Sequence, residues 1–87
     1  MQKFVLIVLR SRTQAFNLNN KLLKSNIPCE IITTPKEIFI GCGFSVKIDE
    51  KYFVQAKNIC NNLYIQSLAG FYLMAFDGRK NVILSLL

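Results

Sequence analysis

A continuous apolar run near the start of the chain constrains its fold more than any other feature of the sequence. Phe4–Leu9 (FVLIVL) is rich in β-branched residues, and a run of this length suits a strand and is too short for a helix. A strand with apolar side chains on both faces is stable only where both faces are covered. The sequence therefore predicts a sheet in which Phe4–Leu9 is buried on both sides.

Two later segments show the periodicity of amphipathic helices. Apolar residues recur at helical spacing over Thr13–Ser25 and again over Glu50–Leu63. Ser11 or Thr13 can cap the first helix and Asp49 the second, because their side-chain oxygens can accept hydrogen bonds from the unpaired amides of a first turn. The sequence therefore predicts two helices, one directly after the first strand and one past the middle of the chain.

The remaining apolar segments have strand length, and their order defines the fold class. We predict strands at Cys29–Thr33, Phe44–Ile48, Leu68–Phe76 with a bulge at Gly70, and Asn81–Leu86, which a tight Asp77-Gly78 turn would join to the strand before it. The order β-α-β-β-α-β predicts an α+β, ferredoxin-like antiparallel sheet with two helices on one face and an extra C-terminal strand. Residues 1–87 fit a single domain, with the core in 1–70 and the last strand and a C-terminal hairpin extension in 71–87.

Both faces of the predicted sheet are apolar. The segment before the hairpin turn places Phe71, Leu73 and Ala75 on one face and Tyr72, Met74 and Phe76 on the other. Two helices can cover only one face, so the second face needs a homodimer partner, a bound protein or the C-terminal strand folded over it. We therefore predict self-association.

Composition excludes several classes of function. The chain has no His, which excludes catalytic triads that need imidazole and zinc sites that need histidine. Its three cysteines are an odd number and form no CxxC motif, so we expect neither a closed disulfide framework nor a four-thiolate metal site. The longest apolar runs, Phe4–Leu9 and Leu68–Phe76, are too short to span a membrane, and no signal-peptide cleavage site follows the first. We expect a cytoplasmic protein with reduced thiols.

The most informative segment of the sequence is residues 33–47, TTPKEIFIGCGFSVK. Thr34-Pro35-Lys36-Glu37 matches a capping box with proline at the first helical position. In that motif the Thr34 hydroxyl accepts from the Glu37 amide, and the Glu37 carboxylate accepts from the Thr34 amide. The motif predicts a short helical turn over Pro35–Ile40, which Gly41 can end in a left-handed conformation.

Cys42 follows this turn and is the candidate reactive residue. Gly41 and Gly43 remove side-chain bulk from around its sulfur, and successive amides in such a bend can form a nest that favours a thiolate. Lys36 and Lys47 are close in sequence and can add positive potential, which lowers the pKa of a partly exposed thiol. The negative end of the turn's dipole acts in the opposite direction and raises that pKa.

Cysteine is also among the most frequently buried residues, so each thiol has a structural interpretation. Cys29 lies on a predicted strand and Cys60 on the inner face of the second predicted helix. We interpret both as small core residues. A structural role is also the alternative for Cys42. Unlike Cys29 and Cys60, however, Cys42 lies in a glycine-rich loop.

The run Thr34-Pro35-Lys36-Glu37-Ile38, three further residues, Cys42-Gly43 and a strand ending in Lys47 resembles a family of small bacterial domains. That family is named for selenium/sulfur carrier proteins and is also known as a domain of unknown function. The upstream pattern is similar too: a first strand, a helix ending near Leu22-Leu23-Lys24, and then Ile27-Pro28. The resemblance covers about residues 3–70, and the sequence departs from it at Ile40-Gly41, where the family more often has small polar residues.

The resemblance implies that Cys42 carries sulfur or selenium as a persulfide or selenylsulfide. The protein would then be a transfer protein without turnover of its own, with a cysteine desulfurase-like donor and an unknown acceptor protein as partners. Lys36 would orient the donor or stabilise the anion, and Glu37 would be structural, as the capping partner of Thr34. This chemistry needs one accessible thiol, no metal and no bound cofactor.

The sequence leaves two other functions open. The fold class is shared with RNA-recognition modules, and the chain is basic, with a net charge of +6. Four aromatic residues could stack on bases: Tyr52, Phe53, Phe71 and Tyr72. The basic residues are scattered and the two central strands lack the signature of those modules, so we do not expect nucleic-acid binding. The second alternative is an interaction module in which apolar strands form the interface and Cys42 is structural.

Overall fold

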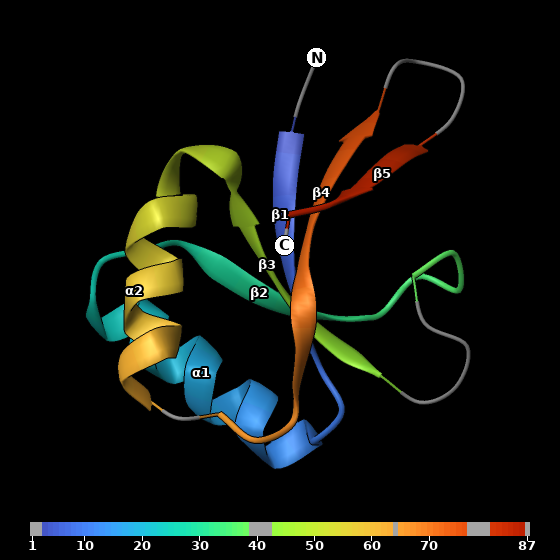
Figure 1. Cartoon of the computed structure of the whole chain (residues 1–87). Helices are drawn as coiled ribbons and strands as arrows, with labels where there is room; N and C mark the ends of the chain where they lie inside the picture. Colours follow the sequence, from blue (N-terminus) through green and yellow to red (C-terminus); the bar gives the residue numbers. More distant parts are fainter. Residues whose placement is uncertain (1–2, 39–42, 64, 77–80, 87) are drawn as a thin grey trace.

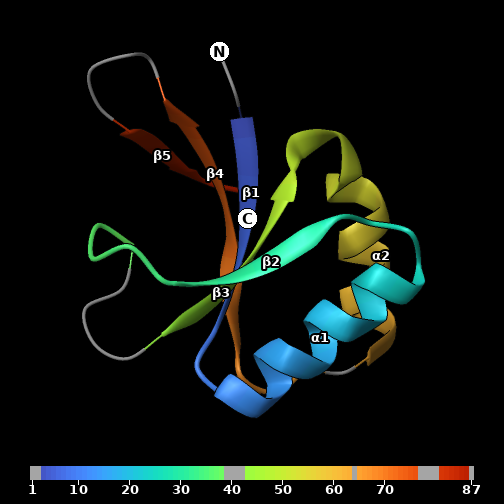
Figure 2. The same cartoon turned by 180° about the vertical axis from the view of Figure 1, so that it is seen from behind.

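A five-stranded antiparallel sheet organises the chain, and both helices lie on one side of it (Figure 1, Figure 2). The computed structural model describes residues 3–38, 43–63, 65–76 and 81–86. Its elements are β1 (Lys3–Leu9), α1 (Arg12–Lys24), β2 (Cys29–Thr33), β3 (Phe44–Asp49), the 3₁₀ turn η1 (Glu50–Tyr52), α2 (Phe53–Leu63), β4 (Leu68–Phe76) and β5 (Asn81–Ser85). No helix in these ranges is long and apolar enough to cross a membrane.

The strand order is β2-β3-β1-β4-β5, so β1 lies at the centre of the sheet. It pairs antiparallel with β3 on one side and with β4 on the other. β2 and β5 form the two edges, paired with β3 and β4 respectively. The predicted α+β, ferredoxin-like arrangement with an extra C-terminal strand is confirmed.

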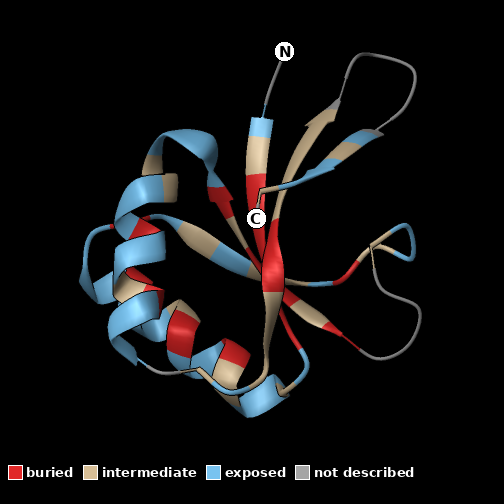
Figure 3. Cartoon of the chain, viewed as in Figure 1, coloured by how far each residue is buried: buried red, intermediate tan, exposed pale blue. Residues whose placement is uncertain are grey.

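The core lies between the sheet and the two helices. Alternate residues of β1 point toward the helices and pack against their apolar faces. Figure 3 shows the buried stretches of these elements in red. The main contributors are Val5, Ile7 and Leu9 from β1, Ala15, Leu18 and Leu22 from α1, Ala56 and Cys60 from α2, and Phe71 from β4. All of them are buried, as the helical and strand periodicities predict.

The centre of the face opposite the helices is sealed by the chain itself. Leu6 and Val8 point away from the helices, yet they are 0% and 1% exposed. Beside them the Tyr72 ring lies over Gly70, with its Cε1 atom only 3.2 Å from the point where a Cβ would be. The C-terminal strand does not fold over this face, because β5 pairs edge to edge with β4. The centre of the second face is therefore covered within one chain, and self-association stays a prediction.

Helix starts and the predicted bulge follow local side-chain chemistry. Ser11 is the N-cap of α1 and accepts the Gln14 amide at 3.2 Å. Asp49 accepts the Lys51 amide at 3.0 Å, which forms a tight turn, and the chain continues as η1 before α2 begins at Phe53. The pairing of β1 with β4 shifts register opposite Gly70, which has a φ of 152°, so the predicted bulge is confirmed. The predicted Asp77-Gly78 turn lies outside the described residues.

Truncation of Leu6 should destabilise the isolated chain strongly. Leu6→Ala would leave a cavity on the face that has no helix, and we expect a loss of about 2–5 kcal/mol in the free energy of unfolding. Leu23→Ala on α1 is the matched control, because that leucine is exposed, and it should cost less than about 1 kcal/mol. Urea unfolding at low protein concentration measures both. Equal effects of the two substitutions would contradict burial of Leu6 within one chain.

Candidate functional site

The candidate reactive thiol lies in the β2–β3 loop, residues 34–43. Cys42 and Gly41 fall outside the described residues, as do Phe39 and Ile40. Both ends of the loop are described, and they lie where β2 ends and β3 begins. The structure therefore shows how the loop is anchored, and the anchors are the part of the site that can be built from contacts.

Two hydrogen bonds tie the ends of the loop together. The Thr34 amide donates to the Gly43 carbonyl oxygen at 3.1 Å, directly beyond the last β2–β3 pair. The hydroxyls of Thr34 and Ser45 share a hydrogen bond at 2.8 Å, and both residues are buried. Gly43, the residue after Cys42 in the sequence, is buried, and the hydrogen bond from the Thr34 amide to its carbonyl oxygen fixes its position.

The predicted capping box is wrong. The Thr34 hydroxyl pairs with Ser45 rather than with the Glu37 amide, so Glu37 is not its capping partner. The physical reason is burial, since a buried hydroxyl such as that of Ser45 needs a protein partner, whereas exposed Glu37 can bond to water. The predicted helical turn over Pro35–Ile40 is present in its described part, where the Ile38 amide closes a single turn by donating to the Pro35 carbonyl oxygen at 3.0 Å. The rest of that turn lies outside the described residues.

Sequence reasoning missed Ser45 as a site residue. Ser45 lies between Phe44 and Val46 at the start of β3, is fully buried, and is paired with Val8 of β1. The available signal was its polar side chain at a position flanked by Phe44 and Val46. A lone serine of this kind indicates a buried hydrogen bond but does not identify the partner.

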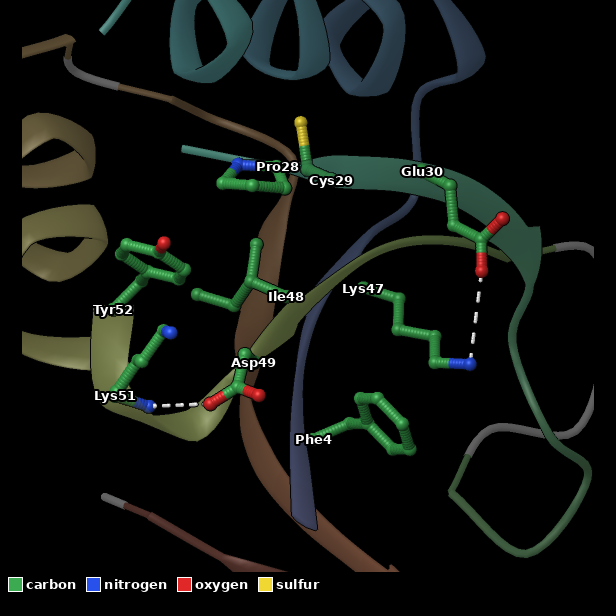
Figure 4. Close-up of a pocket in the computed structure, with 9 residues that line it drawn as sticks. All are labelled: Phe4, Pro28, Cys29, Glu30, Lys47, Ile48, Asp49, Lys51 and Tyr52. Atoms are coloured by element: carbon green, nitrogen blue, oxygen red, sulfur yellow. Dashed lines mark hydrogen bonds and ion pairs between the residues drawn. The ribbon is translucent and has the colours of Figure 1, made fainter. Parts of the chain in front are cut away.

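The two lysines predicted to support the thiol lie in different surroundings. Lys36 is exposed within the loop. Lys47 is four positions after Gly43 on β3, about 13 Å along a strand that rises ~3.3 Å per residue. Its ammonium lies 3.6 Å from Glu30 Oε1 and 4.1 Å from the centre of the Phe4 ring (Figure 4). Lys36 is therefore the lysine with a side chain free to serve a ligand on the loop.

Lys47 lines a hollow at the other end of β3 from the loop. Figure 4 shows its lining residues, which are Phe4, Pro28, Cys29, Glu30, Lys47, Ile48, Asp49, Lys51 and Tyr52. Its lysines and carboxylates are equal in number, and Glu30 already pairs with Lys47. Cys29 directs its sulfur away from Lys47, toward α1, where the thiol donates to the Asn19 carbonyl at 3.3 Å. The hollow therefore presents no reactive group.

Burial suppresses the reactivity of the two described cysteines. Cys60 is 3% exposed in the core beneath α2, and desolvation raises its pKa from 9.0 to about 11. Cys29 is half-buried, and desolvation raises the pKa of its thiol as well. Because the thiolate is the nucleophile, a raised pKa lowers the reactive fraction of both thiols at neutral pH.

The aromatic residues considered for base stacking are in part core residues. Phe53 and Phe71 form an edge-to-face pair with ring centres 5.7 Å apart, and Phe71 is buried on the face that the helices cover. Tyr52 and Tyr72 are half-buried. Base stacking needs open ring faces on the free side of the sheet, and Phe71 cannot supply one.

Comparison with known protein families gives a match over most of the chain. The family model described as "Putative Se/S carrier protein-like" matches residues 4–69. The matched range runs from β1 into the start of β4 and includes the whole β2–β3 loop with Cys42, in agreement with the resemblance seen in the sequence. No curated protein matches the chain.

Removal of either hydroxyl at the base of the loop should leave its partner buried without a hydrogen bond. We expect Thr34→Val and Ser45→Ala each to lower the free energy of unfolding by about 1–3 kcal/mol. The double variant should lose less than the sum, because it leaves no orphaned hydroxyl. Thr33→Val is the control, since Thr33 is exposed and should change stability by less than about 0.5 kcal/mol. Additive effects in denaturant unfolding would contradict the pairing.

Alkylation of the Cys42→Ser variant should depend steeply on pH. The remaining thiols should react slowly with iodoacetamide at pH 7, and the Cys60 rate should rise about tenfold per pH unit toward pH 11. The unfolded chain ionises this thiol near pH 9.0, so the free energy of unfolding should also fall as pH rises from 9.0 toward about 11. Mass spectrometry of labelled peptides measures the rates, with urea-unfolded protein as the fast control. Rapid labelling of the folded variant at pH 7 would contradict the burial argument.

Proposed function

Because the chain belongs to the Se/S carrier protein-like family, we propose that it carries sulfur or selenium on the thiol of Cys42. The observation that carries this proposal is the division among its cysteines. Burial raises the pKa of Cys29 and Cys60, and only Cys42 lies in a glycine-flanked loop within the matched range. A carrier needs one nucleophilic thiol, and competing thiols would trap the cargo at unproductive positions.

The proposed transfer is an exchange between sulfur atoms. The Cys42 thiolate attacks the terminal sulfur of a persulfide on a donor enzyme of the cysteine desulfurase type. A new S–S bond forms on Cys42 as the donor's S–S bond breaks, and the electron pair of the broken bond leaves with the donor thiolate. The acceptor repeats the same step on Cys42, so the carrier returns to a thiolate and needs no oxidant. With selenium, the terminal atom is selenium and the bond on Cys42 is a selenylsulfide.

The anchored base of the loop supports this role. Gly43 is held by the Thr34 amide, and the buried Thr34–Ser45 pair fixes the point where the chain enters β3. A thiol presented from a fixed base reaches a partner with less loss of conformational freedom than one on a free chain. Exposed Lys36 would attract the negatively charged terminal atom, and the net charge of +6 would speed docking to an acidic donor.

Intact-mass analysis tests the carrier proposal. We expect the wild-type chain, incubated with a cysteine desulfurase and cysteine, to gain about 32 Da, the mass of one sulfur atom. Cys42→Ser should gain nothing. Cys29→Ser is the matched control and should still gain sulfur, because a serine hydroxyl can keep the hydrogen bond to the Asn19 carbonyl. The proposal fails if Cys42→Ser is loaded as well as the wild type, or if no variant is loaded by a desulfurase that loads a known carrier.

A further inference from the structure

β5 is an edge strand with an open outer side. In the described ranges its backbone pairs with β4 alone, and no strand lies beyond it. Val82 and Leu84 on this strand are 38% and 55% exposed, and Figure 3 shows β5 largely in the colours of exposed and intermediate residues. An exposed strand edge with apolar side chains is a template for another strand.

The register determines which backbone groups point outward. The Leu86 amide donates to the Phe71 carbonyl at 2.9 Å, in continuation of the β4–β5 register. Bonding alternates along an antiparallel pair, so Leu84 and Val82 also direct their backbone groups toward β4. The N–H and C=O groups of Ile83 and Ser85 therefore point away from β4, and no described residue bonds to them.

The opposite edge of the sheet is protected and β5 is not. The β2 edge carries the charged Glu30, whose side chain is two-thirds exposed. Pro28 precedes this strand and Pro35 follows it, and the strand packs beside α1. Charges, prolines and flanking elements are the usual means of preventing strand addition. Asn81–Ser85 contains no charge, no proline and no glycine.

We propose that β5 pairs antiparallel with β5 of a second copy of this chain, with Ile83 of each copy on the two-fold axis. Ile83 then faces Ile83, and both exchange their outward hydrogen bonds. Val82 of one copy lies opposite Leu84 of the other, and opposite residues share a face. The exposed apolar side chains of both copies therefore form one cluster, and the two sheets become one continuous sheet.

Self-complementarity favours a second copy over an unrelated strand. When two such strands pair antiparallel about Ile83, Val82 of each strand lies opposite Leu84 of the other, so the strand is complementary to itself. A five-residue strand pair is small beside a standard interface, so we expect a dissociation constant on the order of 100 μM. Each copy carries a charge of +6, so salt should strengthen the dimer by screening repulsion. An acidic partner strand would show the opposite salt dependence.

Sedimentation of the full-length chain under reducing conditions tests the pairing. The wild type should dimerise with rising concentration, more strongly at high salt. Leu84→Lys should weaken dimerisation at least about tenfold, since it replaces apolar contact across the axis with two added charges. Val54→Lys is the matched control, because Val54 is 69% exposed on α2, which lies on the opposite side of the molecule from β5 (Figure 1), and it should leave dimerisation nearly unchanged.

Amide hydrogen exchange on the wild type gives a second readout that does not depend on a variant folding. The Ile83 and Ser85 amides should become protected as concentration rises, whereas protection of Leu84, already bonded to β4, should change little. A chain that stays monomeric to about 1 mM would overturn the proposal. Association that Leu84→Lys leaves intact, or that protects other amides instead, would overturn it as well.

Discussion

Burial of β1 on both faces is the constraint from which the rest of the architecture follows. Val5–Leu9 are at most 1% exposed although helices cover only one side of the sheet. A strand of this kind needs neighbours on both edges, which β3 and β4 provide, and cover above and below. The helices provide one cover. Thr34, paired with Ser45, and the ring of Tyr72, beside Gly70, lie on the other side.

The second cover couples the core to the candidate site. Ser45 is buried beside Val8 in the sheet, so its hydroxyl needs a hydrogen-bond partner. Thr34 is that partner, and its amide also holds Gly43. The interaction that satisfies a polar group inside the sheet thus also defines the base of the loop that carries Cys42.

The three cysteines illustrate how burial assigns chemistry. The same thiol group is a packing unit under α2 at Cys60 and a hydrogen-bond donor to α1 at Cys29, and desolvation raises the pKa of both. Cys42 is the one cysteine set between two glycines. β5 stands apart from this chemistry: it lies beyond the family match and gives the sheet an edge without charge or proline.

Periodicity is a local property, so the sequence determined the strands, the helices and their order, and with them the ferredoxin-like class. The resemblance around Cys42 likewise rests on residues close together in the chain and anticipated the family. Tertiary structure decided which hydroxyl Thr34 binds. A capping box is also local, but Ser45, eleven positions away, becomes a neighbour only when β2 and β3 pair, and a buried hydroxyl competes more strongly for a partner than an exposed amide. Lys47 likewise pairs with Glu30 because the register of β2 and β3 places the two residues opposite each other. The short separation of Lys47 from Cys42 in the sequence does not reveal this pairing.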